Sequence, residues 1–424
     1  MVKGATPKEQ VRAWKLKLKP TSAQKANLAH WAGCSRFLYN KTVAILSNPK
    51  NKTLRDKYRL RNQLCTIKGR DWYEDGKLMK SQNSFYNDKP WLRTCPKAVK
   101  QGAIEEARSN LSACFTNKAR GNIKAFNTPF RTKKKEMQRG WSIHLEKNNV
   151  CRKGDALFVF PDLLGEVKYC KTKQLHKLMP NDKPDMDCKL QKDAYGDFYL
   201  VLSRRVKGKA APDEVRNPVA GDPGIRKFLT TYSPTGEAFM LGNRWASVVM
   251  EEALKVDRMM SEHATEQDPK KRRWLVERMR CIRRRVHNLK AEMHFQCANF
   301  LVKRYDLVML PRLDVNKLVS KGMRRLTTKT ARALLHAGHC AFFDLVKAKC
   351  WEHGINFLHV REEYTTRNCP HCGTLNDCNG SEVYHCQNCG FKHDRDLVGS
   401  LNGLLKGVRV GQAPVHKRYN KAKQ

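Results

Sequence analysis

In PVAGDPGI, residues 218–225, a short apolar run ends on an aspartate and a Pro-Gly bend. A second apolar run follows at 228–232, and the turn SPTG comes next at 233–236. This pattern predicts a strand, a tight bend and a hairpin. Residues 245–305 then show the spacing of long amphipathic helices, which we expect to break at the Asp-Pro step 268–269.

Strands and helices alternate beyond this hairpin. The run LVML at 307–310 predicts a buried strand, residues 330–352 predict a helix, and residues 355–360 predict the next strand. Strands that alternate with helices are typical of an α/β layer with parallel pairing.

The N-terminal half has a different texture. Residues 11–19 alternate apolar and basic side chains, which predicts a strand with one basic face. Residues 22–135 are mostly helical in pattern and strongly basic, and short strands return over 140–206. We expect the first strand to join the later ones in a β-barrel-like module that a helical insertion interrupts.

The charge of the chain points to a polyanion partner. Its 424 residues carry 83 Lys and Arg against 40 Asp and Glu, a net charge of +43 that is spread along the whole length. So large an excess favours nucleic acid as the partner. Its spread along the chain excludes a confined basic tail as the source of the charge. The 40% hydrophobic content is enough for a folded core.

Compartment follows from what the sequence lacks. No apolar run approaches the roughly 18 residues of a membrane span, and the first residues lack the apolar core of a secretory signal. We therefore expect a reducing compartment, in which paired cysteines are more often metal ligands than disulfides.

Two cysteine pairs have the spacing of a zinc site. CPHC at 369–372 and CQNC at 386–389 form a CxxC-x13-CxxC pattern, and Gly373 and Gly390 permit the turns that such knuckles need. Two disulfides or free thiols are the alternative. With four protein ligands and no open position the site is expected to be structural, and its ligands are Cys369, Cys372, Cys386 and Cys389.

Carboxylates stand out in so basic a chain. Asp222 ends a predicted strand, Glu362 and Glu363 end the strand before the cysteine pairs, and Asp394 and Asp396 begin a helix after them. Acidic groups from such ends can converge at one edge of a sheet and bind two Mg²⁺ ions about 3.5–4 Å apart, as phosphodiester hydrolysis requires. A helix cap or a solvated acid is the alternative for each carboxylate taken singly.

These motifs together resemble a known family. GDPGI at 221–225, the cysteine pairs and DRD at 394–396 resemble, in this order, the split RuvC nuclease of the TnpB transposon proteins, RNA-guided DNA endonucleases related to type V CRISPR effectors. Residues 31–40 also resemble the TnpB N-terminal region.

The resemblance implies a multidomain α+β fold. An RNase H-like (RuvC) α/β nuclease domain with a zinc ribbon would join a β-barrel wedge domain that carries a helical recognition insertion. The implied boundaries are the wedge at 1–21 and 137–208, the recognition domain at 22–136, the nuclease domain at 209–366 and 391–406, the ribbon at 367–390 and a basic tail at 407–424.

One departure narrows the resemblance. TnpB proteins usually carry a catalytic Glu directly after the strand matched by 307–310, where this chain has Pro311. PRLDV at 311–315 is similar to the Fanzor branch, the eukaryotic and viral relatives, in which the Glu lies shortly before the ribbon. By this register Glu362 is the relocated residue, with Glu363 as the second choice.

The resemblance also implies site residues and partners. Asp222, Glu362 and Asp396 would be the catalytic residues that hold Mg²⁺, with Asp394 as the second choice in the last motif. A guide RNA would read target double-stranded DNA by base pairing, and the protein, acting as a monomer, would read a short flanking motif.

Two other functions remain open at this stage. A nuclease-inactive, RNA-guided DNA-binding protein would result if nothing replaced the ligand missing at Pro311. A DNA-joining transposase is the weaker alternative, since no second acidic triad is present. KKRR at 270–273 resembles a nuclear localisation run, so we expect a nuclear protein of a eukaryote or virus, or otherwise a prokaryotic cytoplasmic one.

Overall fold

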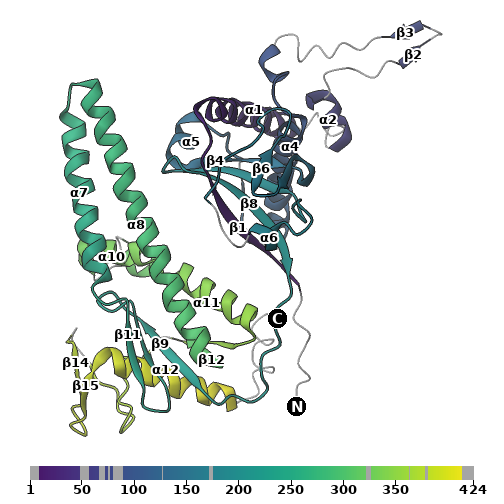
Figure 1. The fold of residues 1–424 in the computed structure, drawn as a ribbon. Helices are drawn as coiled ribbons and strands as arrows, with labels where there is room; N and C mark the ends of the chain where they lie inside the picture. The colour runs from purple at the N-terminus through teal and green to yellow at the C-terminus, as the bar shows by residue number, and fades with distance from the viewer. Residues whose placement is uncertain are drawn as a thin grey trace. The chain divides into compact units, whose positions relative to one another are not determined.

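The computed structural model divides into two compact units, Val11–Arg205 and Val206–Gln424 with Met1–Gln10 (Figure 1). The residues that it describes are 9–47, 57–65, 72–74, 77–79, 89–126, 128–170, 175–320, 326–361, 363–377 and 381–412. No helix in these ranges is both long and apolar enough to cross a membrane. The finer division into five domains stays a prediction.

The N-terminal unit contains a four-stranded sheet in the order β1-β8-β7-β4. The prediction that the first strand joins the later ones is confirmed, because β1 pairs with β8. The strands are β1 (Gln10–Leu18), β4 (Gly140–Leu145), β7 (Cys188–Asp193) and β8 (Phe198–Val206). The strands β5 (Val150–Lys153) and β6 (Ala156–Val159) form a separate two-stranded sheet, and the closed barrel stays a prediction.

Helices pack against this sheet. The first helix begins with a capping box: Thr21 Oγ1 accepts the Gln24 N–H (3.3 Å) while Gln24 Oε1 accepts the Thr21 N–H (3.0 Å). The helices are α1 (Ser22–Ser47), α2 (Lys57–Cys65), α4 (Lys97–Ala119), α5 (Lys133–Arg139) and α6 (Leu175–Leu178), with 3-10 turns at Pro90–Leu92 and Lys147–Asn149 and a short hairpin β2 (Trp72–Glu74)–β3 (Lys77–Met79). The apolar side chains of α1, α2, α4 and the sheet form one core.

The C-terminal unit is built on a five-stranded sheet in the order β11-β10-β9-β12-β13. The first three strands form an antiparallel meander, and β12 and β13 continue parallel to β9. The strands are β9 (Pro218–Pro223), β10 (Leu229–Tyr232), β11 (Ala238–Leu241), β12 (Leu307–Leu310) and β13 (Asn356–His359). The predicted hairpin and the predicted parallel layer are both confirmed.

Helices cover both faces of this sheet. On one face, α8 (Pro269–Arg304) and α11 (His339–His353) pack their apolar residues against side chains such as Val219 and Val308. On the other face lies α12 (Arg395–Gln412), whose Leu404 packs with Ala220 and Met309. Neighbouring strand residues therefore face opposite layers, as the pleat requires. The helix α7 (Trp245–Thr265) forms with α8 a long hairpin that extends away from the sheet (Figure 1).

The expectation of one continuous helix over 330–352 is wrong. The structure has two helices, α10 (Thr328–Ala337) and α11, joined at Gly338, whose φ of 65° is left-handed. Glycine adopts this conformation without a side-chain clash, so it ends α10 while α11 begins at the next residue. A short helix α9 (Val315–Val319) precedes them.

Candidate metal centres

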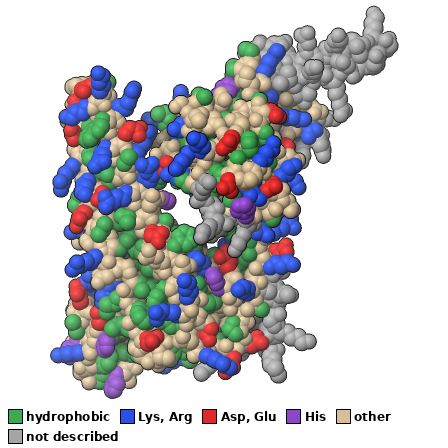
Figure 2. Space-filling view, in the orientation of Figure 1, with side chains coloured by type: hydrophobic (Ala, Val, Ile, Leu, Met, Phe, Trp, Pro, Cys, Tyr) green, Lys and Arg blue, Asp and Glu red, His purple; other side chains and the backbone are tan. Residues whose placement is uncertain are grey.

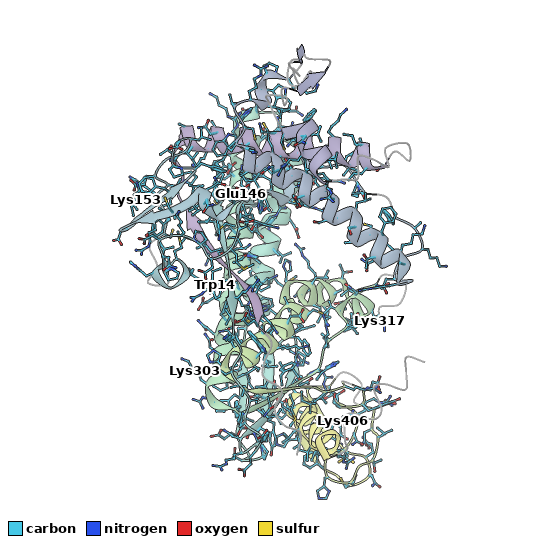
Figure 3. All side chains as sticks on the ribbon, turned by 90° about the vertical axis from the view of Figure 1, so that its right-hand side faces the viewer. Trp14, Glu146, Lys153, Lys303, Lys317 and Lys406 are labelled. Atoms are coloured by element: carbon cyan, nitrogen blue, oxygen red, sulfur yellow. The ribbon has the colours of Figure 1, made fainter. Side chains whose placement is uncertain are left out.

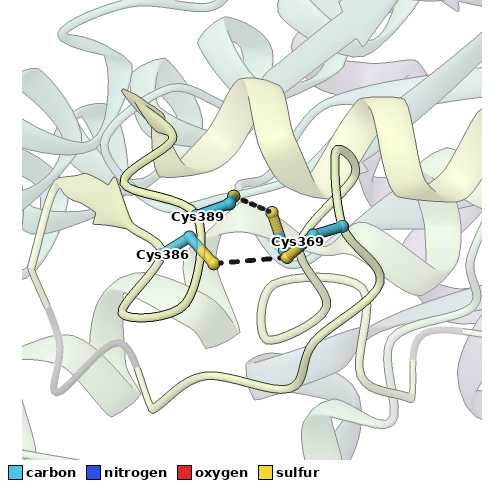
Figure 4. A group of neighbouring side chains, drawn as sticks. Cys369, Cys386 and Cys389 are labelled. Atoms are coloured by element: carbon cyan, nitrogen blue, oxygen red, sulfur yellow. Dashed lines mark hydrogen bonds between the residues drawn. The ribbon is translucent and has the colours of Figure 1, made fainter.

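The four paired cysteines converge on one point. Their sulfurs all lie within 4.8 Å of one another, the sole such group of Cys, His, Asp and Glu side chains within the described ranges. The Sγ atoms of Cys369 and Cys389 are 3.7 Å apart, and those of Cys372 and Cys386 are 3.6 Å apart (Figure 4). Tetrahedral zinc with Zn–S bonds of about 2.3 Å needs S···S distances of about 3.8 Å, so the cluster fits Zn²⁺.

The backbone of the ribbon holds these sulfurs in place. Gly373 and Gly390 have φ values of 77° and 72°, which confirms the predicted glycine turns. The strands β14 (Val383–His385) and β15 (Lys392–Asp394) pair behind the second knuckle. The hydrogen bond between the Cys372 sulfur and the Thr374 hydroxyl oxygen (3.3 Å) lowers the pKa of Cys372 to about 5, which favours the thiolate form that binds metal.

Asp222 lies on the face of the sheet that α12 covers. Ala220, two residues earlier on β9, packs in the α12 layer, and the alternation of the strand places Asp222 on the same side. The carboxylate contacts α12 directly: a Cβ on Gly399 would lie 2.5 Å from Asp222 Oδ2. A side chain at position 399 would therefore displace this carboxylate or push the helix away from it.

Asp396 lies one helical turn before Gly399 in the first turn of α12, and its side chain is 28% exposed. Asp394 precedes it as the helix cap, since its Oδ1 accepts the backbone N–H groups of Asp396 (2.9 Å) and Leu397 (3.4 Å). Burial raises the pKa of Asp394, but the ammonium of Lys227 and these N–H donors outweigh it and hold the pKa below its usual value. Asp394 therefore caps α12, and Asp396 lies on the same helix, one turn before the residue beside Asp222.

The turn between β9 and β10 supplies a cation to this site. Lys227 Nζ lies 2.7 Å from Asp394 Oδ2 and 3.7 Å from Asp396 Oδ2, and its side chain is 20% exposed. The preceding residue, Arg226, forms an ion pair with Glu382 of the ribbon. Phe228, which follows, is buried between the rings of His294 and His339, so the turn is anchored beside the carboxylates.

The loop that enters the ribbon is tied to the same helix. The buried amide of Asn402 on α12 donates to the carbonyls of Thr365 and Asn368 (both 2.7 Å). Lys406, labelled on α12 in Figure 3, donates to the carbonyl of Glu363. The segment from 363 to 368 is thus held along α12, downstream of Asp396.

The predicted acidic residues have different standings. Asp222 and Asp396 come to the same face of the sheet, whereas Glu362 lies outside the described residues. Glu363 is exposed, and its carbonyl is its contact with α12. Asp314, which follows Pro311 in the sequence, caps α9 through its side chain and pairs with Lys317 (3.4 Å).

Sequence reasoning missed two residues of this site. Lys227 lies five residues after Asp222 in a tight turn, and this spacing could have indicated a role beside that carboxylate. Asn402 has no local sequence signal, because its buried hydrogen bonds depend on the folded loop.

Comparison with known proteins gives two family matches. Residues 339–402 match the model described as Cas12f1-like, TNB domain, and residues 11–48 match one described as a helix-turn-helix domain. Over 11–48 the structure has a strand, β1, and one helix, α1.

Whole-length relatives extend the comparison. The chain is 30% identical over 94% of its length to a protein of Paramecium bursaria Chlorella virus 1 named "Putative transposase", of which it covers 87%. A TnpB-like protein of Acanthamoeba polyphaga mimivirus is 25% identical over 93% of this chain and 73% of its own. An Escherichia coli protein named "Putative RNA-guided DNA endonuclease InsQ" is 20% identical over 95% of this chain and 94% of its own. The chain belongs to the family of TnpB-like transposase proteins.

Proposed function

We propose that the chain is an RNA-guided DNA endonuclease whose RuvC-type site is formed by Asp222, Glu362 and Asp396. The observation that carries the proposal is the contact of Asp222 with α12 one turn after Asp396. The sheet supports it too, since a three-stranded meander followed by two parallel strands is the order expected of an RNase H-like nuclease domain. The name of the Escherichia coli relative points to the same reaction.

The donor set of the site suits divalent metal. Carboxylate oxygens are the ligands that Mg²⁺ prefers, and bound divalent ions supply an activated water and stabilise the leaving oxygen of a phosphodiester. In the proposed site Asp222, Asp396 and Glu362 would hold the ions. The ribbon would hold one Zn²⁺ through its four cysteines.

The net charge supports the proposed partners. A guide RNA and target double-stranded DNA present dense phosphates, and the +43 of the chain can bind both. In this proposal the Fanzor-like position of Glu362, the monomeric state and the nuclear location follow from the resemblance of the sequence motifs.

Sequencing the RNA that copurifies with the protein tests the hypothesis that the protein is guided by RNA. We expect one discrete, structured species when this RNA is sequenced. A mixture of random cellular RNA would contradict guidance, even if the protein bound it tightly.

Paired variants test the register of the catalytic Glu. Glu362→Ala should abolish cleavage of a guide-matched DNA and leave RNA binding intact, whereas Asp314→Ala should cut normally because Asp314 is a helix cap. The opposite result would move the third carboxylate to Asp314. A wild-type protein that binds its target but never nicks it would favour the nuclease-inactive alternative.

A further inference from the structure

The tip of the α7–α8 hairpin carries an exposed tryptophan among unpaired cations. Trp274, near the start of α8, is 57% exposed. Lys270 precedes it by four residues and Arg278 follows it by four, with Arg273 alongside, and all three are exposed. Residues three and four apart lie on one face of a helix, so the four side chains form a continuous strip, called here the α8 stripe.

The cations of the α8 stripe differ from their neighbours. Lys271 is bound by Glu262 (3.1 Å) and Glu266 (2.6 Å), and Arg280 is bound by Glu277 (2.6 Å). Within the described part of the chain, no carboxylate pairs with Lys270, Arg273 or Arg278. The stripe thus presents charge that the fold itself does not use, on an arm where Lys and Arg side chains are prominent (Figure 2).

The hairpin holds the α8 stripe rigidly. The side chain of Asp268 caps α8 by accepting the Lys270 N–H (2.9 Å), and Lys271 clamps the tip to the end of α7. Beneath the stripe, Leu275 is buried, and Met279 packs in a small core with Val256 of α7. A preorganised surface of this kind binds without a large ordering cost.

The spacing fits one class of ligand. Four residues of helix rise about 6 Å, so cations stand before and after the indole at intervals close to the length of one nucleotide in an extended strand. An exposed indole can stack only on a base that is not enclosed in a duplex, and stacking between phosphate-binding cations is how proteins hold single strands. We propose that the α8 stripe is a binding site for single-stranded nucleic acid, with Trp274 stacking on an unpaired base.

This surface is independent of the cleavage chemistry. The test measures binding of labelled 20-mers by the full chain freed of copurifying RNA, using an oligo-dT strand, an oligo-U strand and a DNA duplex. Trp274→Ala should weaken binding of the single strands about tenfold, since one stacked base contributes about 1–3 kcal/mol. Trp274→Phe should restore most of the affinity, and binding of the duplex should change less than twofold.

Two further variants separate stacking from charge. Arg278→Gln should lower the slope of log affinity against log salt by about 0.7, whereas Trp274→Ala should leave the slope unchanged. Leu335→Ala is the matched control, because Leu335 is an equally exposed apolar side chain (57%) on α10. A larger loss with oligo-U than with oligo-dT identifies the strand as RNA, and the reverse identifies it as DNA.

Either of two results overturns the proposal. Trp274→Ala binding single strands as tightly as Leu335→Ala would remove the stacking role. An equal loss for the duplex would make the surface a general phosphate contact. Neither result would bear on cleavage, which the Asp222 and Asp396 variants test separately.

Discussion

Lys227 neutralises the carboxylates at the start of α12. Its ammonium lies within 4 Å of both Asp394 and Asp396. There it balances the negative charge of the carboxylates, which would otherwise attract a divalent ion. Because like charges a few ångströms apart repel by 1 kcal/mol or more even in water, a metal bound by Asp396 must overcome the presence of this lysine. Lys227 is therefore expected to set the metal affinity of the site.

Replacing this lysine should tighten metal binding. Lys227→Met keeps the length of the side chain and removes the charge, so we expect the affinity for Mn²⁺, measured by EPR titration without nucleic acid, to rise about fivefold to tenfold. Lys255→Met is the control, since Lys255 pairs with Glu252 on α7. An unchanged or weaker affinity would contradict the assigned role.

Individual residues were predictable where their chemistry is local. Asp222 stood out because it follows an apolar strand in a basic chain, and the cysteines stood out by spacing alone. The contact between Asp222 and Gly399 was not predictable, because it joins residues 177 positions apart and depends on how closely α12 approaches β9. The sequence shows the carboxylates, and the packing shows that Asp222 lies beside α12, the helix that carries Asp396.

At the scale of elements, we expect the ribbon to depend on a metal. Its hairpin is short, and its core consists of a few side chains around Tyr384, two of them cysteines of the candidate zinc cluster. A structural zinc site of this kind contributes directly to folding. The ribbon should therefore lose its order when zinc is removed.

Zinc removal should lower the melting temperature. A strong chelator is expected to shift the thermal transition down by at least about 5 °C, and added Zn²⁺ should restore it. Cys386→Ser should show the lower transition with no response to chelator. A wild-type transition that chelation leaves in place would contradict a structural metal site.

The packing of Phe228 against His339, which anchors the β9–β10 turn, should make the stability of the protein depend on pH. His339, only 3% exposed, stacks on Phe228, and burial followed by the charge of His294 lowers its pKa to about 4. The unfolded state takes up this proton near pH 6.5, so the stabilising effect is complete above that pH and is lost as the pH falls toward 4.

A ring that cannot be protonated should remove this dependence. Between pH 6.5 and 4.5, His339→Phe should lose about 2 kcal/mol less unfolding free energy than the wild type in urea titrations. His353→Phe is the control, because His353 is exposed at the end of the same helix. The unfolding free energy of this variant should change between pH 6.5 and 4.5 as that of the wild type does. Parallel curves for His339→Phe and the wild type would show that the buried ring does not control stability in this range.

Element boundaries were predictable except where a single residue decides. The alternating pattern over 11–19 predicts β1 to within one residue at each end, and the Asp-Pro step marks the break between α7 and α8. The helical pattern over 330–352 does not reveal the break at Gly338, because glycine inside an apolar pattern can be either a helix residue or a left-handed cap. Only the packing of α10 and α11 on different partners distinguishes the two.

At the scale of the whole molecule, we expect the positive charge to bind nucleic acid and a few carboxylates to carry out the cleavage. The +43 of the chain is spread over both units, which suits a long polyanion better than a single docking patch. The carboxylates gather beside α12, where cleavage would occur. The proposed function needs both features, positive charge for binding and carboxylates for cleavage.

The central claim, guided and metal-dependent cleavage at Asp222 and Asp396, has one direct test. The purified protein with its copurifying RNA is incubated with plasmids that carry a guide-matched sequence and a library of flanking motifs, with Mg²⁺ or with EDTA. We expect the wild type to cut the matched site with Mg²⁺ and not with EDTA. We expect the Asp222→Ala and Asp396→Ala variants to bind RNA but not to cut. Matched cutting by Asp222→Ala at the wild-type rate would contradict it.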